Sequence, residues 1–410
     1  MPASPIRKLM PVAEEAKRRG VRVLHLNIGQ PDLETPAVMR DRLARVERTI
    51  AYTPSGGTAE YLASLVEYHR RLGITLDASD LIATTGGSEA LLFAFFAAAS
   101  EGDEALTVEP YYTNYNSFAT MAGVRLVTVP TSGEDGFHLP PREAWERALT
   151  PRTRLVLLCN PNNPTGTVYT AREVRAVAEL CRDRGLFFVC DEVYREFVYD
   201  GHAATSALTL AGFEDQVIVV DSLSKRYSAC GIRLGSLATR NVEVHQAALR
   251  MAQGRLSPPG LAQLLATGAT ELGKEYFDGV VGEYQSRRDL LFEGLTAIPG
   301  VFLRKPEGAF YFIARLPITD SDDFARFLLT AFSHEGATVM VAPAAGFYNT
   351  RGRGRDEVRI AYVLKKEDLA LAVRVLAAGL AAYREARGLE NFPATTPATL
   401  GRPDFFTPAI

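Results

Sequence analysis

A cluster of phosphate-binding residue types stands out in this chain of 410 residues. Ser222, Ser224 and Lys225 form the motif SLSK, and Arg233 follows eight residues after the lysine. Two hydroxyls, an amine and a guanidinium on one turn can hold a phosphate, because all of these groups donate hydrogen bonds and arginine can donate two at once. The lysine follows an apolar run, and a charged residue at that position is not expected to be part of the core.

Three further segments carry complementary chemistry. Residues 191–194 (DEVY) begin with an acidic residue after an apolar run, and a buried carboxylate needs a cationic partner. Residues 160–166 (NPNNPTG) are typical of a turn, but turn chemistry does not explain the two extra Asn side chains. Residues 85–89 (TGGSE) precede an apolar helix. Free N–H groups there suit a phosphate, although an ordinary helix cap explains the glycines equally well.

The elements that must position these motifs are predicted to form an α/β core. Helical segments such as residues 171–184, closed by Gly185, alternate with short apolar runs. Runs without polar alternation are typical of parallel strands buried on both faces. Ligands of such sheets bind outside the carboxyl ends of the strands, where the motifs fall. The predicted strands are residues 105–108, 124–129, 155–159, 186–190 and 217–220.

After about residue 285 the pattern changes to that of a smaller α+β lobe. Its predicted helices are residues 322–334 and 366–384, and residues 391–410 are predicted to be an irregular tail. Its predicted strands are residues 301–304, 309–314, 338–342 and 357–362.

Composition excludes several other classes of protein. Hydrophobic residues make up 47% and charged residues 23%, and the net charge of −3 provides no basic field for nucleic acid. The longest uncharged apolar run, residues 90–99, is too short for a membrane span of about 20 residues. Neither a signal peptide nor a C-x-x-C pair is recognised, so we expect a cytoplasmic protein with reduced thiols. The scattered histidines suggest no metal site.

Taken together, these motifs resemble those of class I/II aminotransferases, which are pyridoxal 5′-phosphate (PLP) enzymes of fold type I. Residues 27–32 (NIGQPD) and 359–362 (RIAY) also match, so the resemblance covers nearly the whole chain. It implies a large domain, with a mostly parallel sheet sandwiched by helices, and a smaller α+β domain. The implied division is residues 1–45 as an N-terminal segment packing with the small domain, 46–285 as the PLP-binding domain, 286–390 as the small domain and 391–410 as the tail.

The resemblance also implies the roles of the catalytic and substrate-binding residues. Lys225 is the lysine that bonds to the cofactor and then carries a proton, and Asp191 pairs with the pyridinium nitrogen. Tyr194 and Asn163 donate hydrogen bonds to the ring oxygen O3′. Arg359 binds the substrate α-carboxylate with two hydrogen bonds. The other implied contacts to that carboxylate come from the backbone of Gly29 and from Asn163.

Further cofactor contacts follow from the same resemblance. Tyr112 is expected to stack on the ring. Tyr52 resembles a tyrosine that reaches the phosphate of a neighbouring subunit, which implies a homodimer with shared active sites. The residues expected to hold the phosphate are Gly87, Ser88, Ser222, Ser224 and Arg233.

The implied reaction is the transfer of an amino group from an L-amino acid to a 2-oxo acid by a ping-pong mechanism. Aspartate or glutamate with 2-oxoglutarate is the leading expectation. Arg255, in residues 252–259 (AQGRLSPP), could bind the distal carboxylate, but an ion pair at a subunit interface explains it equally well. An aromatic, alanine or branched-chain aminotransferase and a PLP C–S lyase stay open as alternatives. A non-catalytic PLP-sensing domain is less favoured, because the match begins close to Met1.

Overall fold

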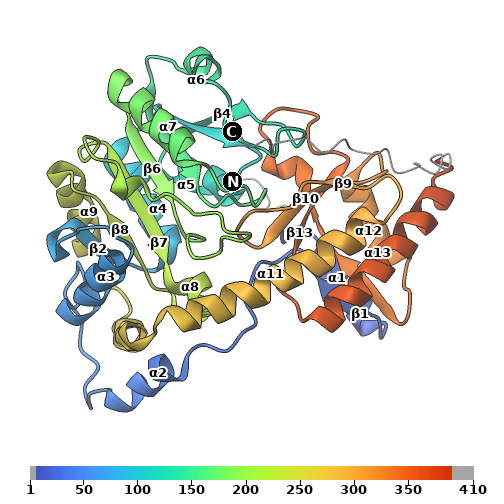
Figure 1. Ribbon diagram of the computed structural model, residues 1–410, viewed down its shortest axis with the longest axis horizontal. Helices are drawn as coiled ribbons and strands as arrows, with labels where there is room; N and C mark the ends of the chain where they lie inside the picture. The colour runs from blue at the N-terminus through green and yellow to red at the C-terminus, as the bar shows by residue number, and fades with distance from the viewer. Residues whose placement is uncertain (1–5, 390–410) are drawn as a thin grey trace, which may run out of the picture.

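The larger body of the protein is built on a seven-stranded sheet (Figure 1), in a computed structural model that describes residues 6–389. The strand order is β2-β8-β7-β6-β5-β3-β4. Strands β3 to β7 run parallel, whereas β8 runs antiparallel to both of its neighbours. The strands are β2 Leu81–Thr84, β3 Glu104–Glu109, β4 Arg125–Pro130, β5 Thr153–Cys159, β6 Phe187–Asp191, β7 Val217–Ser222 and β8 Gly235–Ala238.

Helices cover both faces of this sheet, which explains why its strands lack polar alternation. On β5, Leu155 and Leu157 pack in the apolar cluster that contains helix α4. Val156 and Leu158 point to the other face and pack in the cluster that contains helix α7. The helices of this body are α3 Ala59–Arg71, α4 Gly86–Ala98, α5 Asn114–Met121, α6 Arg142–Ala148, α7 Ala171–Arg184, α8 Leu223–Arg226, α9 Val242–Gly254 and α10 Gly260–Ala266.

Helix α7 has the bounds that the sequence predicts. Thr170 caps its first turn by accepting a hydrogen bond from the N–H of Glu173, and the Glu173 side chain accepts from the N–H of Thr170. At the other end Gly185 has a φ of 63°, a left-handed conformation that glycine adopts without steric cost. Both ends are therefore specified by local chemistry.

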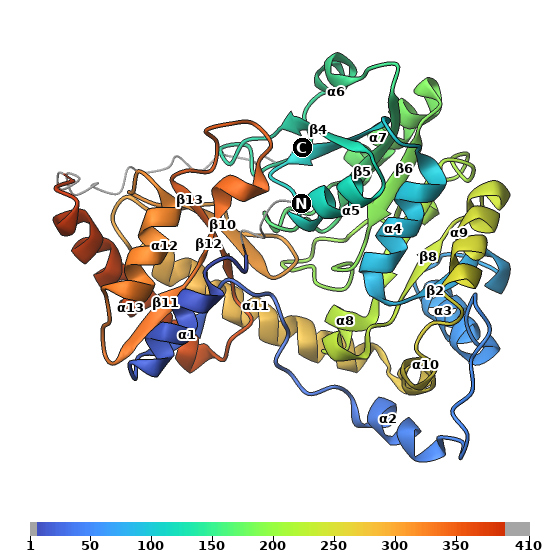
Figure 2. The ribbon, with the colours of Figure 1, turned by 180° about the vertical axis from the view of Figure 1, so that it is seen from behind.

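A smaller lobe contains the antiparallel sheet β12-β13-β10-β9 and the parallel pair β1–β11. Because β1 pairs with β11, the beginning of the described chain lies in this lobe, and helix α1 packs there (Figure 2). The elements of the lobe are α1 Met10–Arg18, β1 Arg22–His25, β9 Phe302–Leu303, β10 Tyr311–Arg315, α12 Ser321–Thr330, β11 Ala337–Met340, β12 Ala342–Pro343, β13 Glu357–Ala361 and α13 Lys366–Ala386.

Helix α11, Lys274–Thr296, runs from the larger body to the smaller lobe in both views (Figures 1 and 2). The boundary expected at residue 285 therefore falls inside a continuous helix. The short helix α2, Ala37–Arg40, lies on the segment that leads from the smaller lobe to the larger body. None of the helices within residues 6–389 is both long and apolar enough to cross a membrane.

The structure differs from the sequence-based expectation in a few places. The helix predicted to reach residue 334 ends at Thr330, because His334 and Ala337 form a bridged turn around Gly336, whose φ is +72°. The strand predicted at 338–342 is two strands, β11 and β12. The apolar runs of the sequence do not predict strands β1, β2 and β8. The predicted tail, residues 391–410, lies outside the described residues.

Candidate active site

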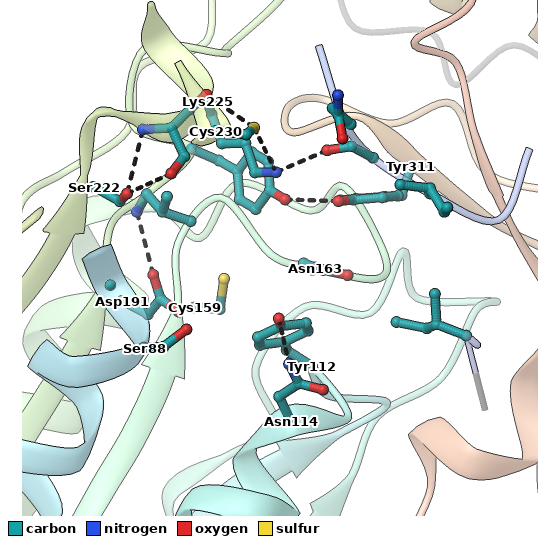
Figure 3. Close-up of a pocket in the computed structure, with 18 of the residues that line it drawn as sticks. Ser88, Tyr112, Asn114, Cys159, Asn163, Asp191, Ser222, Lys225, Cys230 and Tyr311 are labelled. Atoms are coloured by element: carbon teal, nitrogen blue, oxygen red, sulfur yellow. Dashed lines mark hydrogen bonds between the residues drawn. The ribbon is translucent and has the colours of Figure 1, made fainter. Parts of the chain in front are cut away.

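The sequence motifs meet in a cavity of about 510 Å³ at the carboxyl edge of the central sheet (Figure 3). Tyr52 and Arg255 are the two predicted site residues that do not line this cavity. The predicted residues that line it are Gly29, Gly87, Ser88, Tyr112, Asn163, Asp191, Tyr194, Ser222, Ser224, Lys225, Arg233 and Arg359.

Strand register explains why motifs far apart in the chain converge. Cys159 at the end of β5 lies opposite Asp191 at the end of β6, and Asp191 lies opposite Val220 on β7. The neighbouring parallel strands therefore end at the same level, and the residues that follow them share one edge. Ser222 ends β7, so helix α8 carries Lys225 directly above that edge.

One end of the cavity is built to bind an anion. Helix α4 begins at Gly86 without a side-chain cap, so its first N–H groups are free to bind an anion. Gly87 and Ser88 line the cavity beside the hydroxyls of Ser222 and Ser224, which lie 2.8 Å apart. A phosphate at this end would accept hydrogen bonds from both the helix terminus and the hydroxyls.

Arg233 supplies the cationic group at the same end of the cavity. Its Nη1 donates to the carbonyl of Cys230 over 3.0 Å, which fixes the guanidinium. A Cβ on Gly86 would lie 2.6 Å from Arg233 Nη2, and Gly86 has a φ of +75°, so only glycine fits there without displacing the arginine.

Asp191 is a buried carboxylate without an opposing charge. Burial raises its pKa to about 6, although hydrogen bonds from the Tyr115 hydroxyl (2.8 Å) and the Val193 N–H (3.3 Å) act in the opposite direction. No cation within residues 6–389 forms an ion pair with it. A bound group with a protonated ring nitrogen would supply the missing charge and the missing donor.

Lys225 reaches the middle of the cavity. Its Nζ donates a hydrogen bond to the Gly29 carbonyl over 2.8 Å and lies 3.8 Å from Cys230 Sγ. Neither partner is a carboxylate, so the amine is held in place without an ion pair. Figure 3 shows Lys225 and Asp191 approaching the cavity from two different strand ends.

Arg359 on β13 is the cation that the smaller lobe contributes. Its side chain is buried, and burial lowers its pKa. Nη1 donates to Asn163 Oδ1 over 3.0 Å and Nη2 donates to the Asn27 carbonyl over 2.6 Å, whereas Nε has no hydrogen-bond partner within residues 6–389. Since only the oxygen of Asn163 can face a guanidinium, its NH₂ group is free to donate elsewhere. A buried guanidinium without a counter-ion suits a carboxylate ligand.

Three tyrosines form part of the wall between these charges. The hydroxyls of Tyr194 and Tyr311 lie 2.7 Å apart, and burial raises the pKa of Tyr194 well above its usual range. The guanidinium of Arg359 lies 4.3 Å from the centre of the Tyr311 ring. Tyr112 is partly buried, and its hydroxyl accepts a hydrogen bond from Asn114.

Tyr311 and Tyr115 belong to none of the motifs that predict the site. Tyr311 falls within a predicted strand, and Tyr115 within a short helix, and both types of position are usually occupied by core aromatics. The hypothetical Cβ of Gly29 would lie 1.9 Å from the Tyr311 hydroxyl. Gly29 in the NIGQPD motif is thus the one sequence signal of this contact, because only a residue without a side chain lets the Tyr311 hydroxyl come so close to the backbone.

The two remaining predicted residues lie away from the cavity of their own chain. Tyr52 is 81% exposed. Arg255 Nη2 donates to the carbonyls of Ser55 (3.0 Å) and Ala83 (3.2 Å), and its Nη1 lies 3.4 Å from Glu89 Oε2. Within the described chain, Arg255 therefore binds groups of the larger body.

Comparisons with known proteins agree with this geometry. Residues 21–376 match the family model described as aminotransferase class I and II. The chain is 31% identical over 368 residues to the aspartate/prephenate aminotransferase of Thermus thermophilus, a match that covers 88% of this chain and 92% of that one.

Two solved structures superpose on nearly the whole chain. A single mutant of Thermus thermophilus aspartate aminotransferase has a TM-score of 0.84 at 31% identity and covers 92% of this chain and 97% of that one. An alanine aminotransferase from Pyrococcus furiosus also has a TM-score of 0.84, at 27% identity, and covers 93% of this chain and 98% of that one.

Fold and site thus define a fold type I aminotransferase, which confirms the fold class expected from the sequence. The chain belongs to the aminotransferase class I and II family, and it is a transaminase. Enzymes of this family depend on PLP and act on amino acids and 2-oxo acids.

Proposed function

We propose that this protein is a PLP-dependent aminotransferase that moves the amino group of aspartate or glutamate to a 2-oxo acid such as 2-oxoglutarate. The observation that carries the proposal is Asp191, a buried carboxylate that no cation of the described chain neutralises. Burying an unpaired carboxylate costs folding free energy unless a cationic ligand pairs with it. The pyridinium nitrogen of PLP is such a ligand.

The residues around Asp191 fit the other parts of PLP. The N-terminus of α4, Ser222, Ser224 and Arg233 would hold the phosphate. Lys225 would hold the cofactor covalently, and Tyr112 would stack on its ring. The free NH₂ group of Asn163 and the Tyr194 hydroxyl would donate hydrogen bonds to the ring oxygen.

The mechanism follows from what these residues hold or move. PLP, when bound, supplies an electron-withdrawing ring that stabilises negative charge at the substrate Cα. Asp191 keeps a proton on the ring nitrogen, and Arg359 fixes the substrate by its α-carboxylate. Lys225 Nζ, once free, takes the proton from Cα as a general base, a role that suits an amine held without an ion pair. A second half-reaction with a 2-oxo acid reverses these steps, giving ping-pong kinetics.

The substrate assignment rests on the relatives as well as on the site. The Thermus thermophilus relative is an aspartate/prephenate aminotransferase, whereas a Pyrococcus furiosus structure of similar fold is an alanine aminotransferase. Aspartate or glutamate is our first choice. Alanine, aromatic or branched-chain amino acids and a C–S lyase reaction are the alternatives that the experiment below separates.

We also propose a homodimer in which Tyr52 completes the phosphate site of the neighbouring subunit. A tyrosine that is 81% exposed is unusual in a folded chain, and Ile50 close to it is 66% exposed. A partner subunit would cover both side chains. Arg255 would belong to the same interface, and its role toward a distal carboxylate stays a hypothesis. A cytoplasmic location, with four unpaired cysteines, is part of this proposal.

The test is a set of single-substrate half-reactions. PLP-loaded protein is mixed with one L-amino acid at a time and no acceptor, and the oxo acid released is measured. We expect about one equivalent of oxo acid per site from aspartate or glutamate, because a ping-pong enzyme completes the first half alone. Absence of any oxo acid contradicts the proposal. Release of ammonia with the oxo acid, over many turnovers, identifies a lyase.

A further inference from the structure

The cavity contains one more cation than the proposed mechanism uses. Among the described residues, four cationic side chains line it, namely Lys225, Arg233, Arg359 and Arg7, together with a single carboxylate, that of Asp191. Three of the cations have assigned partners in the proposed function: the cofactor, its phosphate and the substrate α-carboxylate. Arg7 has none.

Arg7 lies on a segment that is fastened to the smaller lobe on both sides. The carbonyl of Ile6 accepts a hydrogen bond from Asn27 Nδ2 over 2.9 Å, and Lys8 forms an ion pair with Asp322. Asn27 is also the residue whose carbonyl binds Arg359. The backbone beside Arg7 is therefore tied to the residues that hold the α-carboxylate site.

The guanidinium of Arg7 lines the cavity and has no hydrogen-bond or ion-pair partner among the described residues. It is exposed, and within residues 6–389 it forms no ion pair with a carboxylate. Burial raises the pKa of Tyr112 to about 12, and the charges of Arg359 and Arg7 both oppose that rise. Both guanidinium groups thus act on the same tyrosine, one from a buried position and one from an exposed position.

Charge balance indicates what Arg7 would bind. The phosphate is matched by Arg233 and the helix terminus, the pyridinium by Asp191, and the α-carboxylate by Arg359. With a monocarboxylic substrate, the cavity keeps one unmatched positive charge at Arg7. A second carboxylate on the substrate would neutralise that charge and accept two hydrogen bonds from one guanidinium.

Arg255, the residue that the sequence suggests for the distal carboxylate, has more contacts within its own chain than Arg7. Its guanidinium already donates to the Ser55 and Ala83 carbonyls and lies near Glu89. Both of its hydrogen bonds use Nη2, and they tie the guanidinium to the larger body outside the cavity of its own chain, although Nε and Nη1 have no hydrogen-bond partner among the described residues. Arg7, by contrast, lines the cavity itself.

We propose that Arg7 is a specificity-determining residue that binds the distal carboxylate of dicarboxylic amino and 2-oxo acids. This inference rests on the proposed function, because it concerns the substrate of the same site. It assigns the preference for acidic substrates to the segment before helix α1.

The experiment uses the PLP-loaded enzyme and the variants Arg7→Gln, Arg7→Lys, Arg255→Gln and Lys8→Gln. Binding of succinate and of propionate, which differ by one carboxylate, is measured by calorimetry, and kcat/KM is measured for aspartate and alanine. Arg7→Gln should weaken succinate binding and aspartate turnover by about ten- to a hundredfold and leave propionate and alanine nearly unchanged. Arg7→Lys should lose less succinate affinity and less aspartate turnover than Arg7→Gln, because lysine keeps the positive charge. Lys8→Gln, the adjacent matched control, should bind succinate like the wild type.

Two results would overturn the inference alone. One is that Arg7→Gln loses the same affinity for succinate as for propionate. The other is that Arg7→Gln binds succinate like the wild type, while Arg255→Gln binds succinate more weakly and propionate normally. That result would assign the distal carboxylate to Arg255. Failure of the proposed function looks different, because wild-type enzyme would then release no oxo acid from any amino acid.

Discussion

The hydroxyl of Tyr115 donates a hydrogen bond of 2.8 Å to Oδ2 of Asp191, while the N–H of Val193 lies 3.3 Å from Oδ1. These two contacts fix the plane of the carboxylate that would face the cofactor nitrogen. Tyr115 does not line the cavity, so it is a positioning residue rather than a catalytic one.

Tyr115→Phe should therefore lower kcat by about three- to thirtyfold while changing KM less, because a hydrogen bond to a charged group contributes about 1.5–3 kcal/mol at most. The readout is steady-state kinetics together with the pH dependence of kcat. Tyr111→Phe is the matched control, since the Tyr111 hydroxyl accepts a hydrogen bond from Asn116 and has no other hydrogen bond within the part of the chain that the structure describes. If both variants lose activity equally, or neither does, Tyr115 does not position Asp191.

Asp191→Asn should stabilise the cofactor-free protein but reduce the activity of the PLP-loaded enzyme. The folded pKa of about 6 lies above the ordinary 3.8, so Asp191 itself does not destabilise the cofactor-free fold below about pH 4, and its destabilising contribution grows as the pH rises from about 4 to about 6. Removing the charge should stabilise the cofactor-free protein by roughly 2–3 kcal/mol above pH 7 and by almost nothing near pH 4.

Urea unfolding of cofactor-free protein at several pH values measures this difference, with the exposed Asp135→Asn as control. In the loaded enzyme the same Asp191→Asn change should reduce kcat by orders of magnitude, because the ring nitrogen loses its anionic partner. A pH-independent stability difference would mean that Asp191 has the same pKa in the folded and the unfolded protein. Full activity of Asp191→Asn would remove it from the mechanism.

Arg359→Lys should raise KM for every amino acid donor. Lysine keeps the charge but loses the two-pronged geometry, and we expect a loss of about ten- to a hundredfold in kcat/KM. Arg315→Lys on the adjacent strand β10 is the control, because Arg315 lies outside the cavity and pairs with Glu134 near the surface. Donor affinities unchanged in Arg359→Lys would place the α-carboxylate site elsewhere.

The parallel core could be predicted from sequence because both faces of its strands are buried. The runs of β3 to β7 are mostly apolar, and Thr170, Glu173 and Gly185 specify both ends of α7. Strands β2 (LIAT) and β8 (GSLA) have four residues each and carry little signal. In β8, Gly235 is required by packing, since a Cβ there would lie 2.5 Å from the Asp221 carbonyl. Such a long-range contact cannot be read from local pattern.

Much of the candidate site could be predicted because its motifs directly follow strands. The places of Lys225, Asp191 and Asn163 after apolar runs predict them as site residues, and all three line the cavity. Arg7 and Tyr311 could not be found this way. Arg7 reaches the cavity only because β1 pairs with β11, and Tyr311 only because Gly29 lets it approach. Both depend on contacts between distant parts of the chain.

The proposed dimer predicts complementation between two inactive variants. If Tyr52 completes the neighbouring site, Tyr52→Ala and Lys225→Ala chains should form heterodimers with one intact site, and an equal mixture should recover about a quarter of wild-type activity. Arg359→Ala mixed with Lys225→Ala should recover none, because those two residues line one cavity of a single chain. Equal recovery in both mixtures, or none in either although subunits exchange, would contradict shared active sites.

The central claim is that Lys225 carries the cofactor, and borohydride reduction tests it most directly. Reduction of the PLP-loaded enzyme makes the bond between lysine and cofactor permanent, and peptide mapping by mass spectrometry then locates the label. The account predicts one pyridoxyl group per chain, on Lys225, and no label on Lys225→Ala, in which the cofactor can bind only non-covalently. Labelling of another lysine, such as Lys274 or Lys305, with Lys225 unmodified, would contradict it.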